Sequence, residues 1–296
     1  MDKIEITVFT PTFNRAHILK RCYNSLCNQS YKKFIWLVVD DGSFDETKEL
    51  IEKWTKDEVI RIKYIYQENA GKQMAVNKAV LNCDTKYFAF LDSDDFYKST
   101  TIEKMMNIFK EIEDDNLIAG IMARRGDSEN KVVGSTNLPN SIIIEHYWYL
   151  INKFNYYGDT CRAYRTEVLR EFLYPYTGEK FIPENVMFDK IDKKYKLYII
   201  NEIFSISEYK QDGYTIKNKK ILKENPKGYY LSLSEQMTSK YSIKTIIKSV
   251  ISYTIWCWKN GIDKYYSNCP RKGIYILMLP ISIIFYLLKI PRWYFN

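Results

Sequence analysis

Three carboxylates follow an apolar run in the segment FAFLDSDDF, residues 88–96: Asp92, Asp94 and Asp95. Clustered aspartates are the hard oxygen ligands that Mg²⁺ and Mn²⁺ prefer. A divalent ion bound there would neutralise phosphate oxygens and stabilise a diphosphate leaving group as its bond breaks. Alternatively, DSDD is a solvated turn that caps the helix expected near Thr100, because Asp and Ser are ordinary turn residues.

The segments around these carboxylates alternate between predicted β-strands and predicted α-helices. Short runs rich in β-branched and aromatic residues, each too apolar for a one-sided strand, lie at 4–10, 33–40, 60–66 and 86–92. Between them, apolar residues recur at helical spacing in 16–29, 44–56 and 71–82. This order, βαβαβαβ, predicts an α/β fold with a Rossmann-like, mostly parallel sheet and helices on both faces.

All four predicted strands end in polar segments, where ligands of such sheets bind. These segments are TPTFNR (10–15), DDGS (40–43), ENAGK (68–72) and DSDD (92–95). The first has no glycine, which disfavours a G-x-G-x-x-G dinucleotide site, and Gly71-Lys72 is followed by Gln73 rather than the Ser or Thr of a P-loop. Recognition of phosphate through a bound divalent ion is therefore expected.

Composition indicates a globular protein with a sizeable core, since 46% of the 296 residues are hydrophobic and 27% are charged. The six cysteines include no CxxC pair, and neither His17 nor His146 stands at zinc spacing from them. We expect reduced, structural thiols. The opening residues have the pattern of a strand rather than of a signal peptide, so we expect the N-terminal part in the cytoplasm.

Four segments together resemble the family 2 glycosyltransferases, which have the GT-A fold. They are VFTPTFNR, VVDDGSFDET, NAGKQMAVNKA and FAFLDSDD, and in this order and spacing they carry the resemblance over roughly residues 4–110. The resemblance implies a nucleotide-diphospho-sugar donor, a divalent metal, and an inverting displacement at the anomeric carbon.

The resemblance also assigns roles around the donor. In TPTFNR it places a first loop around the base and ribose: Pro11, Thr12, Phe13 and Arg15. The resemblance implies that Asp41 hydrogen-bonds the base and that Asp40 organises the loop in which it lies. It also places Lys72 near the base or the phosphates. The alternatives are a packed loop aromatic for Phe13, and for Asp40 and Asp41 a cap of the helix expected near Phe44.

The DSDD segment matches the D-x-D pair of the family. The resemblance implies Mn²⁺ or Mg²⁺ as the cofactor, with Asp94 as its direct ligand and Asp95 as a helper. Asp92 is a further metal ligand that lies nearer the ribose, and Ser93 belongs with it to the donor site.

An inverting transfer also needs a carboxylate that takes the proton of the acceptor hydroxyl. In GEKFIPENVMFDKI (178–191), PENVMF stands where the family usually carries Glu-Asp before a helix, but its second residue is Asn185. Glu184 is therefore expected as the base, with Asp189, one helical turn beyond Asn185, in reserve. Alternatively, Glu184 and Asn185 only cap the helix.

Two later stretches resemble segments of bacterial surface-polysaccharide and teichoic-acid-type transferases of this family. They are YYGDTCRAYRTEVLREF (156–172) and SEYKQDGYT (207–215). They would place Asp159 and Arg162 near the acceptor and Asp212 near the mouth of the site. The Q-x-x-R-W motif of processive members does not occur, so addition of a single sugar is expected.

The C-terminal tail combines positive charge with apolar segments. From Lys217 onward there are fourteen Lys and Arg against three Asp and Glu, or +11 in a chain whose net charge is +8. Residues 239–261 predict a basic amphipathic helix, which lies on anionic lipid or packs on the catalytic domain. Residues 273–288 lack charge but would reach only about 24 Å and contain Pro280, which favours an in-plane or re-entrant anchor.

We therefore expect residues 1–110 to bind the donor, 111–225 to bind the acceptor and supply the base, and 226–296 to form a membrane-associated helical tail. The expected protein is a metal-dependent inverting glycosyltransferase at the cytoplasmic face of the membrane. Its donor is a UDP-sugar, its acceptor a lipid-linked or polymeric surface glycan, and nucleic acid is not an expected partner. A nucleotidyltransferase and a non-catalytic, membrane-bound nucleotide-sugar binder are the alternatives.

Overall fold

The computed structural model describes residues 3–128, 130–134, 138–207 and 220–289. The chain divides into two compact units, the first formed by Met1–Tyr174 and Lys194–Gln211, the second by Pro175–Lys193 and Asp212–Asn296. Strands from both sides of residue 110 share one sheet, and the expected division at 110 and 225 by function stays a prediction.

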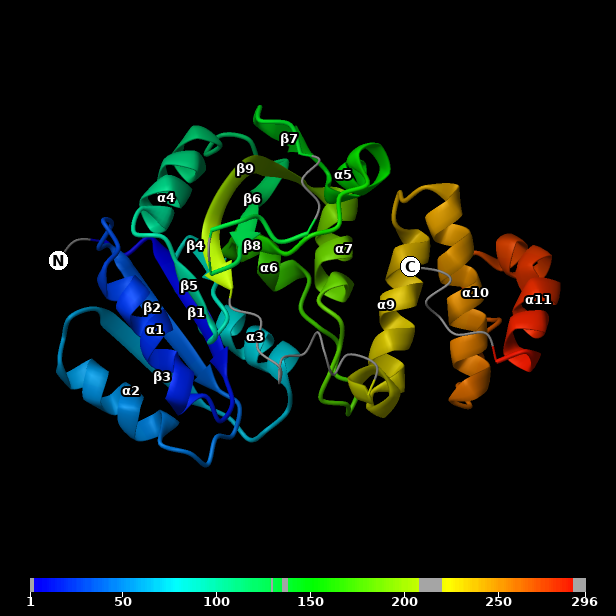
Figure 1. Cartoon of the computed structure of the whole chain (residues 1–296), viewed down its shortest axis with the longest axis horizontal. Coiled ribbons are helices and arrows are strands. Elements are labelled where there is room, and N and C mark those ends of the chain that lie inside the picture. The colour runs from blue at the N-terminus through cyan, green and yellow to red at the C-terminus, as the bar shows by residue number, and fades with distance from the viewer. Residues whose placement is uncertain (1–2, 129, 135–137, 208–219, 290–296) are drawn as a thin grey trace. The chain divides into compact units, whose positions relative to one another are not determined.

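The first half of the first unit has the predicted alternation of strands and helices (Figure 1). Its elements are β1 (Ile6–Thr12), α1 (Ala16–Cys27), β2 (Phe34–Asp40), α2 (Thr47–Lys56), β3 (Arg61–Tyr66), α3 (Lys72–Leu81) and β4 (Tyr87–Phe90). The βαβαβαβ order is thus confirmed.

The rest of the first unit adds shorter and more varied elements. They are β5 (Asp95–Tyr97), α4 (Thr101–Glu111), β6 (Ile118–Gly126), β7 (Ile143–Glu145), α5 (Tyr147–Phe154), β8 (Thr160–Arg165), α6 (Thr166–Glu171) and β9 (Lys196–Ser207).

The sheet is mixed, in the order β3-β2-β1-β4-β8-β6-β9-β5, with β7 paired to β9. Strands β3, β2, β1 and β4 are parallel to one another, and β6 is parallel to β9. Strand β8 is antiparallel to both β4 and β6, and β9 is antiparallel to β5 and β7. The expectation of a mostly parallel sheet is thus confirmed for β3, β2, β1 and β4, whereas the rest of the sheet is mixed, with β6 and β9 parallel and the other pairs antiparallel. The prediction rested on β–α–β alternation, which only the first four strands possess.

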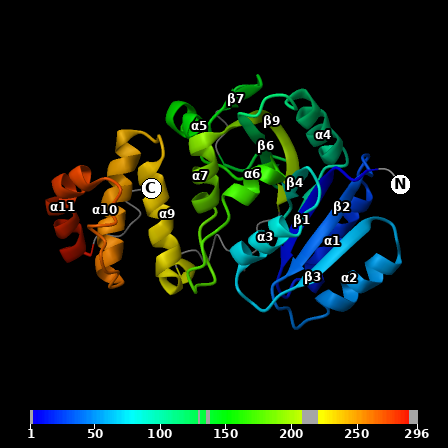
Figure 2. The same cartoon turned by 180° about the vertical axis from the view of Figure 1, so that it is seen from behind.

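Helices cover both faces of this sheet (Figures 1 and 2). Buried residues of α1, α2 and α4 form one core with alternate strand residues such as Val8 and Trp36. The intervening residues, among them Phe9 and Leu37, point to the opposite face, since successive side chains of a strand alternate. Helix α3 packs there against β1 and β2.

Strand β3 departs from the expectation that every strand is covered on both faces. It lies at one edge of the sheet, and its end residues, Arg61 and Tyr66, are exposed. Its apolar run therefore reflects half-burial at an edge rather than a central position.

The second unit contains α7 (Asn185–Lys194, of which the last residue belongs to the first unit), α9 (Pro226–Thr238), α10 (Ile243–Lys259) and α11 (Lys272–Leu287). Helices α9, α10 and α11 run side by side in both views. The apolar stripe of α10 is buried at Ile246, Val250 and Ile251. The stripe thus faces neighbouring helices of the same unit, α9 and α11. The two alternatives given for this segment, contact with anionic lipid and packing on the catalytic domain, stay predictions.

Helix α11 presents a largely exposed apolar surface. Its exposed residues include Ile276, Leu277, Ile281, Ile283, Ile284, Tyr286 and Leu287. The helix continues through Pro280, which was expected to interrupt it. Among the described helices, none combines the length and the hydropathy needed to cross a bilayer.

Candidate active site

The carboxyl ends of β1, β2 and β4 lie side by side on one side of the sheet, which we call the rim. Thr12 pairs with Asp40, Asp40 pairs with Tyr66, and β4 ends at Phe90 beside Phe9. Parallel pairing therefore brings the four polar segments that follow these strands to one rim, as the sequence indicated.

Asp41 holds the loop between β3 and α3. Its Oδ1 accepts hydrogen bonds from Gln67 Nε2 (2.7 Å) and the amide of Ala70 (2.8 Å), and its Oδ2 accepts from the amide of Gly71 (2.9 Å) and from Asn69 Nδ2 (3.3 Å). The side chain is buried. Asp41 therefore shapes the loop before Lys72, and a contact between its carboxylate and a base would have to replace one of these bonds.

Asp40 accepts two hydrogen bonds at the turn that follows β2. Its Oδ1 accepts from the amide of Ser43 at 2.8 Å, and its Oδ2 accepts from the hydroxyl of Tyr64 at 2.7 Å. Gly42 has φ +88°, and a Cβ there would lie 2.8 Å from the amide nitrogen of Asn69. The turn thus needs glycine both for its left-handed backbone and for the close approach of the next loop.

Neither Asp40 nor Asp41 caps the next helix, which begins at Thr47 rather than near Phe44. Asp45 contacts the start of that helix, since its Oδ1 accepts from the amide and hydroxyl of Thr47 and its Oδ2 from the amide of Ala16 at 3.0 Å. Burial acts to raise the pKa of Asp45, but these hydrogen bonds outweigh burial and lower it. Asp45 thereby joins the starts of α1 and α2.

The first loop and the turn after β2 support each other. Asn14, at φ +53°, donates its amide to Ser43 Oγ and accepts the amide of Phe44 on its side-chain oxygen. Phe13 and Phe44 meet edge to face with 6.2 Å between ring centroids, and Phe13 remains 42% exposed. Phe13 thus packs against one other aromatic ring, as the packed-aromatic alternative predicts, but a large part of its ring faces solvent.

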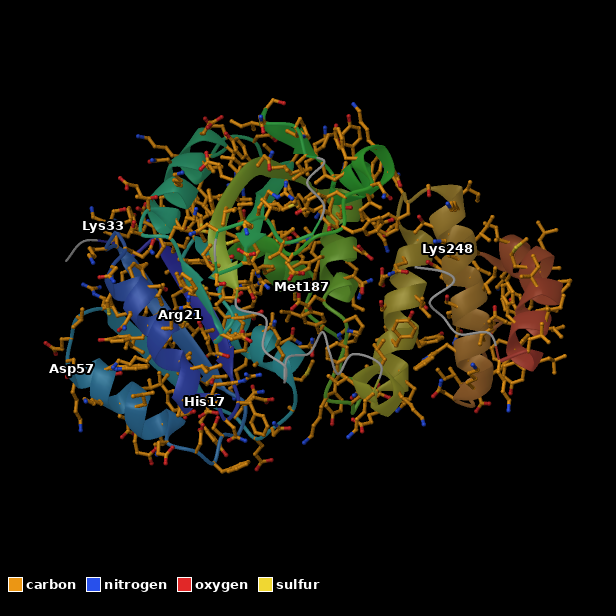
Figure 3. The ribbon with its side chains drawn as sticks, in the orientation of Figure 1. His17, Arg21, Lys33, Asp57, Met187 and Lys248 are labelled. Carbon is orange, nitrogen blue, oxygen red and sulfur yellow. The ribbon has the colours of Figure 1, made fainter. Side chains whose placement is uncertain are left out.

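The DSDD segment forms a tight turn between β4 and β5. The amide of Asp95 bonds the carbonyl of Asp92 at 3.0 Å, and Asp95 then begins β5, which pairs with β9. Helix α1 supports β5 because the guanidinium of Arg21 lies 3.9 Å over the ring of Phe96; Arg21 is labelled on α1 in Figure 3. The helix at Thr101 has no side-chain cap, so DSDD is not its cap.

Four charged groups meet at this turn. Lys72 Nζ lies 2.7 Å from Asp92 Oδ1, and Arg125 Nη2 lies 3.0 Å from Asp95 Oδ2 and 3.8 Å from Asp92 Oδ2. Asp95 is buried, whereas the side chains of Asp92, Lys72 and Arg125 keep between a fifth and a third of their surface. The rim thus pairs acidic residues of one loop with cations from α3 and β6.

The two paired carboxylates titrate in opposite directions. Burial acts to raise the pKa of Asp92, but the nearby charges of Lys72 and Arg125 outweigh burial and lower it. Burial raises the pKa of Asp95 to about 7, with Arg125 opposing and neighbouring carboxylates adding to the shift. Asp92 therefore ionises at a lower pH than Asp95.

Two further polar side chains are buried at this rim without a hydrogen bond to any described residue. They are Thr12, through its hydroxyl, and Gln73, through both atoms of its amide in the first turn of α3. Buried polar groups are normally satisfied by protein, water or a ligand. These groups are candidates for contacts with a bound molecule.

In the second unit, Glu184 and Asp189 have different surroundings. Glu184 is exposed, and its carbonyl accepts the amides of Met187 and Phe188 at the start of α7. Asp189 is 3% exposed and accepts from Asn185 Nδ2 at 2.9 Å and from the hydroxyl of Tyr241 at 2.7 Å. These bonds hold Asp189 as a structural carboxylate, which leaves Glu184 as the stronger candidate for a base.

The residues expected near the acceptor differ in how exposed they are. Asp159 lies 4.0 Å from Arg125 Nη1 and is 44% exposed. Arg162 is buried, donates from Nε to the hydroxyl of Thr160 at 2.8 Å, and lies 4.6 Å over the ring of Tyr147. Asp212 lies outside the described residues.

Residues 7–173, more than half of the chain, match the family described as glycosyl transferase family 2. The chain belongs to this family. With family 2 membership shown, the nucleotidyltransferase alternative is dropped.

Among curated family 2 relatives, the Bacillus subtilis protein TuaG is named as a teichuronic acid biosynthesis glycosyltransferase. It is 35% identical to this chain over 107 residues, which are 36% of this chain and 42% of TuaG. A pneumococcal glycosyltransferase, GlyA, is 35% identical over 111 residues, 38% of this chain and 16% of its own length. The matched segment thus spans less than half of each relative.

A crystal structure of S. aureus TarS 1–349 in complex with UDP has a TM-score of 0.66 to this chain at 14% identity, and covers 95% of this chain and 89% of TarS 1–349. TarS 1–349 has also been solved with UDP-GlcNAc. At this identity the likeness shows the fold, which is the GT-A-like α/β fold of family 2.

The fit of a metal to this family 2 rim rests on its donor set. Three aspartates within four residues supply the oxygen ligands that Mg²⁺ and Mn²⁺ accept. Within the described residues, however, no group of three acidic, His or Cys side chains is already arranged around a common point. Lys72 and Arg125 instead contact Asp92 and Asp95. The aspartates are thus suitable ligands for a divalent ion, but the ion would have to compete with these two cations for them.

Sequence reasoning missed several residues that shape this site. Gln67 and Asn69 hold Asp41, Tyr64 holds Asp40, and Arg125 joins the acidic turn. Asn69 is the first residue of the segment NAGKQMAVNKA that carried the resemblance, and Gln67 lies two positions before it, so this segment was an available indication. Arg125 lies beyond the region of resemblance, in a part of the chain where the sequence analysis predicted no strand, and the indication there was the charge pair Arg124-Arg125.

Proposed function

We propose that this chain is an inverting glycosyltransferase that moves a sugar from a nucleotide-diphosphate donor, a UDP-sugar, to a surface glycan or a lipid-linked glycan. Family 2 membership supports glycosyl transfer, and the fold shared with TarS, solved with UDP, supports the choice of nucleotide. The name of TuaG supports a cell-surface polysaccharide as the acceptor.

One observation carries the proposal: the loop before α3 and the DSDD turn after β4 meet through Lys72 and Asp92 at 2.7 Å. This contact places a cation and an acidic turn together at the carboxyl end of the sheet, where nucleotides bind in α/β folds. The exposed part of Phe13 offers a surface for a base or ribose, with Pro11, Thr12 and Arg15 in the same loop.

Asp94, Asp92 and Asp95 would hold Mn²⁺ or Mg²⁺, which when bound neutralises charge on the diphosphate. Lys72 adds a fixed positive charge toward the same phosphates, while Asp41 keeps its loop in shape.

In the proposed reaction the acceptor hydroxyl oxygen forms a bond to the anomeric carbon as the bond from that carbon to the diphosphate oxygen breaks. Glu184 takes the hydroxyl proton, and the nucleoside diphosphate leaves with the electron pair of the broken bond. Attack from the face opposite the leaving group inverts the anomeric configuration. Without the Q-x-x-R-W motif of processive enzymes, one sugar is added at each encounter.

Calorimetric titration of UDP, GDP and CMP into the full chain, with and without Mn²⁺, tests the donor assignment. We expect UDP to bind with Mn²⁺ present and the Asp94→Asn variant to lose that binding. Release of UDP from UDP-sugars in the presence of glycan acceptors then tests turnover. Binding of UDP without turnover for every sugar and acceptor would support the non-catalytic alternative instead.

We also propose that α11 attaches the protein to the cytoplasmic face of the membrane, where a lipid-linked acceptor is found. Leu277 and Leu287 are 71% and 69% exposed, and the described residues from Lys264 to Lys289 contain no Asp or Glu. An apolar helix surface among basic residues suits an in-plane contact with anionic lipid.

Co-sedimentation with vesicles of equal parts phosphatidylcholine and phosphatidylglycerol tests the attachment. We expect the double variant Leu277→Glu, Leu287→Glu to lose binding and Leu117→Glu, an exposed leucine of the first unit, to keep it. Equal sedimentation of all three proteins would contradict the proposal, and a loss of self-association in the double variant would indicate a second copy of the chain as the partner of α11.

A further inference from the structure

Arg125 reaches the acidic turn from a strand that is two places away in the sheet. Strand β9 lies between β6 and β5, with Arg125 opposite Ser205 and Asp95 opposite Ser207. Two strand spacings are about 10 Å, a distance that an extended arginine side chain can cross. The position of Arg125 is thus a product of strand order and not of sequence proximity.

Arg125 contacts three carboxylates at graded distances. Its Nη2 lies 3.0 Å from Asp95 and 3.8 Å from Asp92, while its Nη1 lies 4.0 Å from Asp159. Asp95 is 2% exposed and Asp159 is 44% exposed. The guanidinium therefore bridges the buried acidic turn and a more solvated carboxylate beyond it.

The contact with Asp95 is electrostatic and not a hydrogen bond. Asp95 Oδ2 is buried and accepts no hydrogen bond from any described residue, although Arg125 is within 3.0 Å. A metal ion that took the place of Arg125 beside Asp95 Oδ2 would therefore break no hydrogen bond to that oxygen. Asp92, which is 28% exposed, and the buried Asp95 when it is ionised nevertheless need a positive partner, because charge withdrawn from water without a partner is costly.

We propose that Arg125 is the internal cation that competes with a divalent metal ion for Asp92 and Asp95, and that it moves toward Asp159 when the metal binds. Arg125 is thus a positioning residue that sets the metal affinity of the donor site. This inference rests on the proposed function, since it takes the DSDD turn as the metal site.

The affinity of the full chain for Mn²⁺, without nucleotide, tests the competition. Free Mn²⁺ is followed by electron paramagnetic resonance during titration of wild type, Arg125→Gln and the control Lys104→Gln. Lys104 is a matched choice because it is a half-exposed cation of the same unit whose ion pair is with Glu202 and not with Asp92 or Asp95. We expect Arg125→Gln to bind Mn²⁺ about tenfold more tightly, because a like charge beside the ion is removed, and Lys104→Gln to match wild type.

Equal or weaker Mn²⁺ binding by Arg125→Gln, with Lys104→Gln unchanged, would overturn the proposal. Because this variant leaves the buried Asp95 without its cation, it can fail to fold, and a measurement on wild type provides an independent test. The Nε signal of Arg125 in a ¹⁵N spectrum should shift when Mg²⁺ is added and stay in place when NaCl is added at the same ionic strength. A signal unmoved by saturating Mg²⁺ would refute the displacement.

The failure of this inference and of the proposed function are distinguishable. If wild type binds no divalent ion but still releases UDP from a UDP-sugar on addition of acceptor, the competition is refuted and glycosyl transfer stands. If metal binds as described but no UDP-sugar is turned over, the competition stands and the proposed reaction is refuted.

Discussion

The ammonium nitrogen of Lys72 lies 2.7 Å from Oδ1 of Asp92, and neither side chain is more than 28% exposed. This ion pair joins the start of α3 to the turn after β4, two segments that the sequence suggested separately. The pair also means that a substitution at Lys72 changes the surroundings of Asp92.

Replacing Lys72 by Gln should weaken UDP binding about tenfold, because a charge-assisted contact to phosphate is lost. Calorimetry in the presence of Mn²⁺ measures this change. Lys104→Gln, which removes a lysine from a surface ion pair, is the control and should bind UDP as wild type does. Unaltered affinity in Lys72→Gln would place this lysine outside the donor site.

Glu184 and Asp189 should separate into a catalytic and a structural carboxylate. Glu184→Gln is expected to lower kcat by roughly 100-fold or more, with little change in thermal stability because the side chain is exposed. Asp189→Ala should instead destabilise the protein by about 3 kcal/mol, since Asn185 and Tyr241 lose a buried acceptor. Thermal unfolding and initial rates of UDP release distinguish the two. The opposite pattern would make Asp189 the base.

Asp41→Asn should loosen the loop before α3. An amide group cannot accept all the hydrogen bonds that the carboxylate takes from Gln67, Ala70 and Gly71. We expect a loss of about 2 kcal/mol and faster hydrogen exchange at the amides of Ala70 and Gly71. Glu68→Gln, in the same loop but exposed, is the matched control. Protection that is equal in both variants would show that Asp41 does not hold the loop.

Asp45→Asn should change how stability depends on pH. The pKa of Asp45 is lowered in the folded protein, so its contribution is present above the unfolded pKa of about 4 and is lost as pH falls through the lower folded value. The variant should therefore be less stable than wild type at neutral pH, by about 1 kcal/mol, and the difference should shrink below about pH 4.

Midpoints of thermal unfolding between neutral and acid pH measure this dependence. Asp57→Asn is the control, because Asp57 ends α2 and has no bond of this kind to the start of α1. A difference between wild type and Asp45→Asn that grew toward acid pH would contradict the assignment.

Local sequence was sufficient for the first four strands and three helices, and for the rim where Asp40, Asp41 and Asp92 lie. These features depend on hydrophobic period and on the rule that parallel strands deliver their carboxyl ends to one edge, both of which are readable in the chain. The family resemblance in the same region was confirmed over residues 7–173.

Tertiary structure decided what neighbouring residues could not. The antiparallel entry of β8 beside β4 makes the sheet mixed, and the place of β9 between β6 and β5 brings Arg125 to Asp95, thirty positions earlier in the chain. Burial of Asp189 depends on Tyr241, more than fifty residues away. Such pairings are set by which strands and helices pack together, and the energies that select them are summed over the whole core. The residue types of this candidate active site can therefore be predicted from local motifs. The residues that pair with them and shift their pKa values are determined by the tertiary structure.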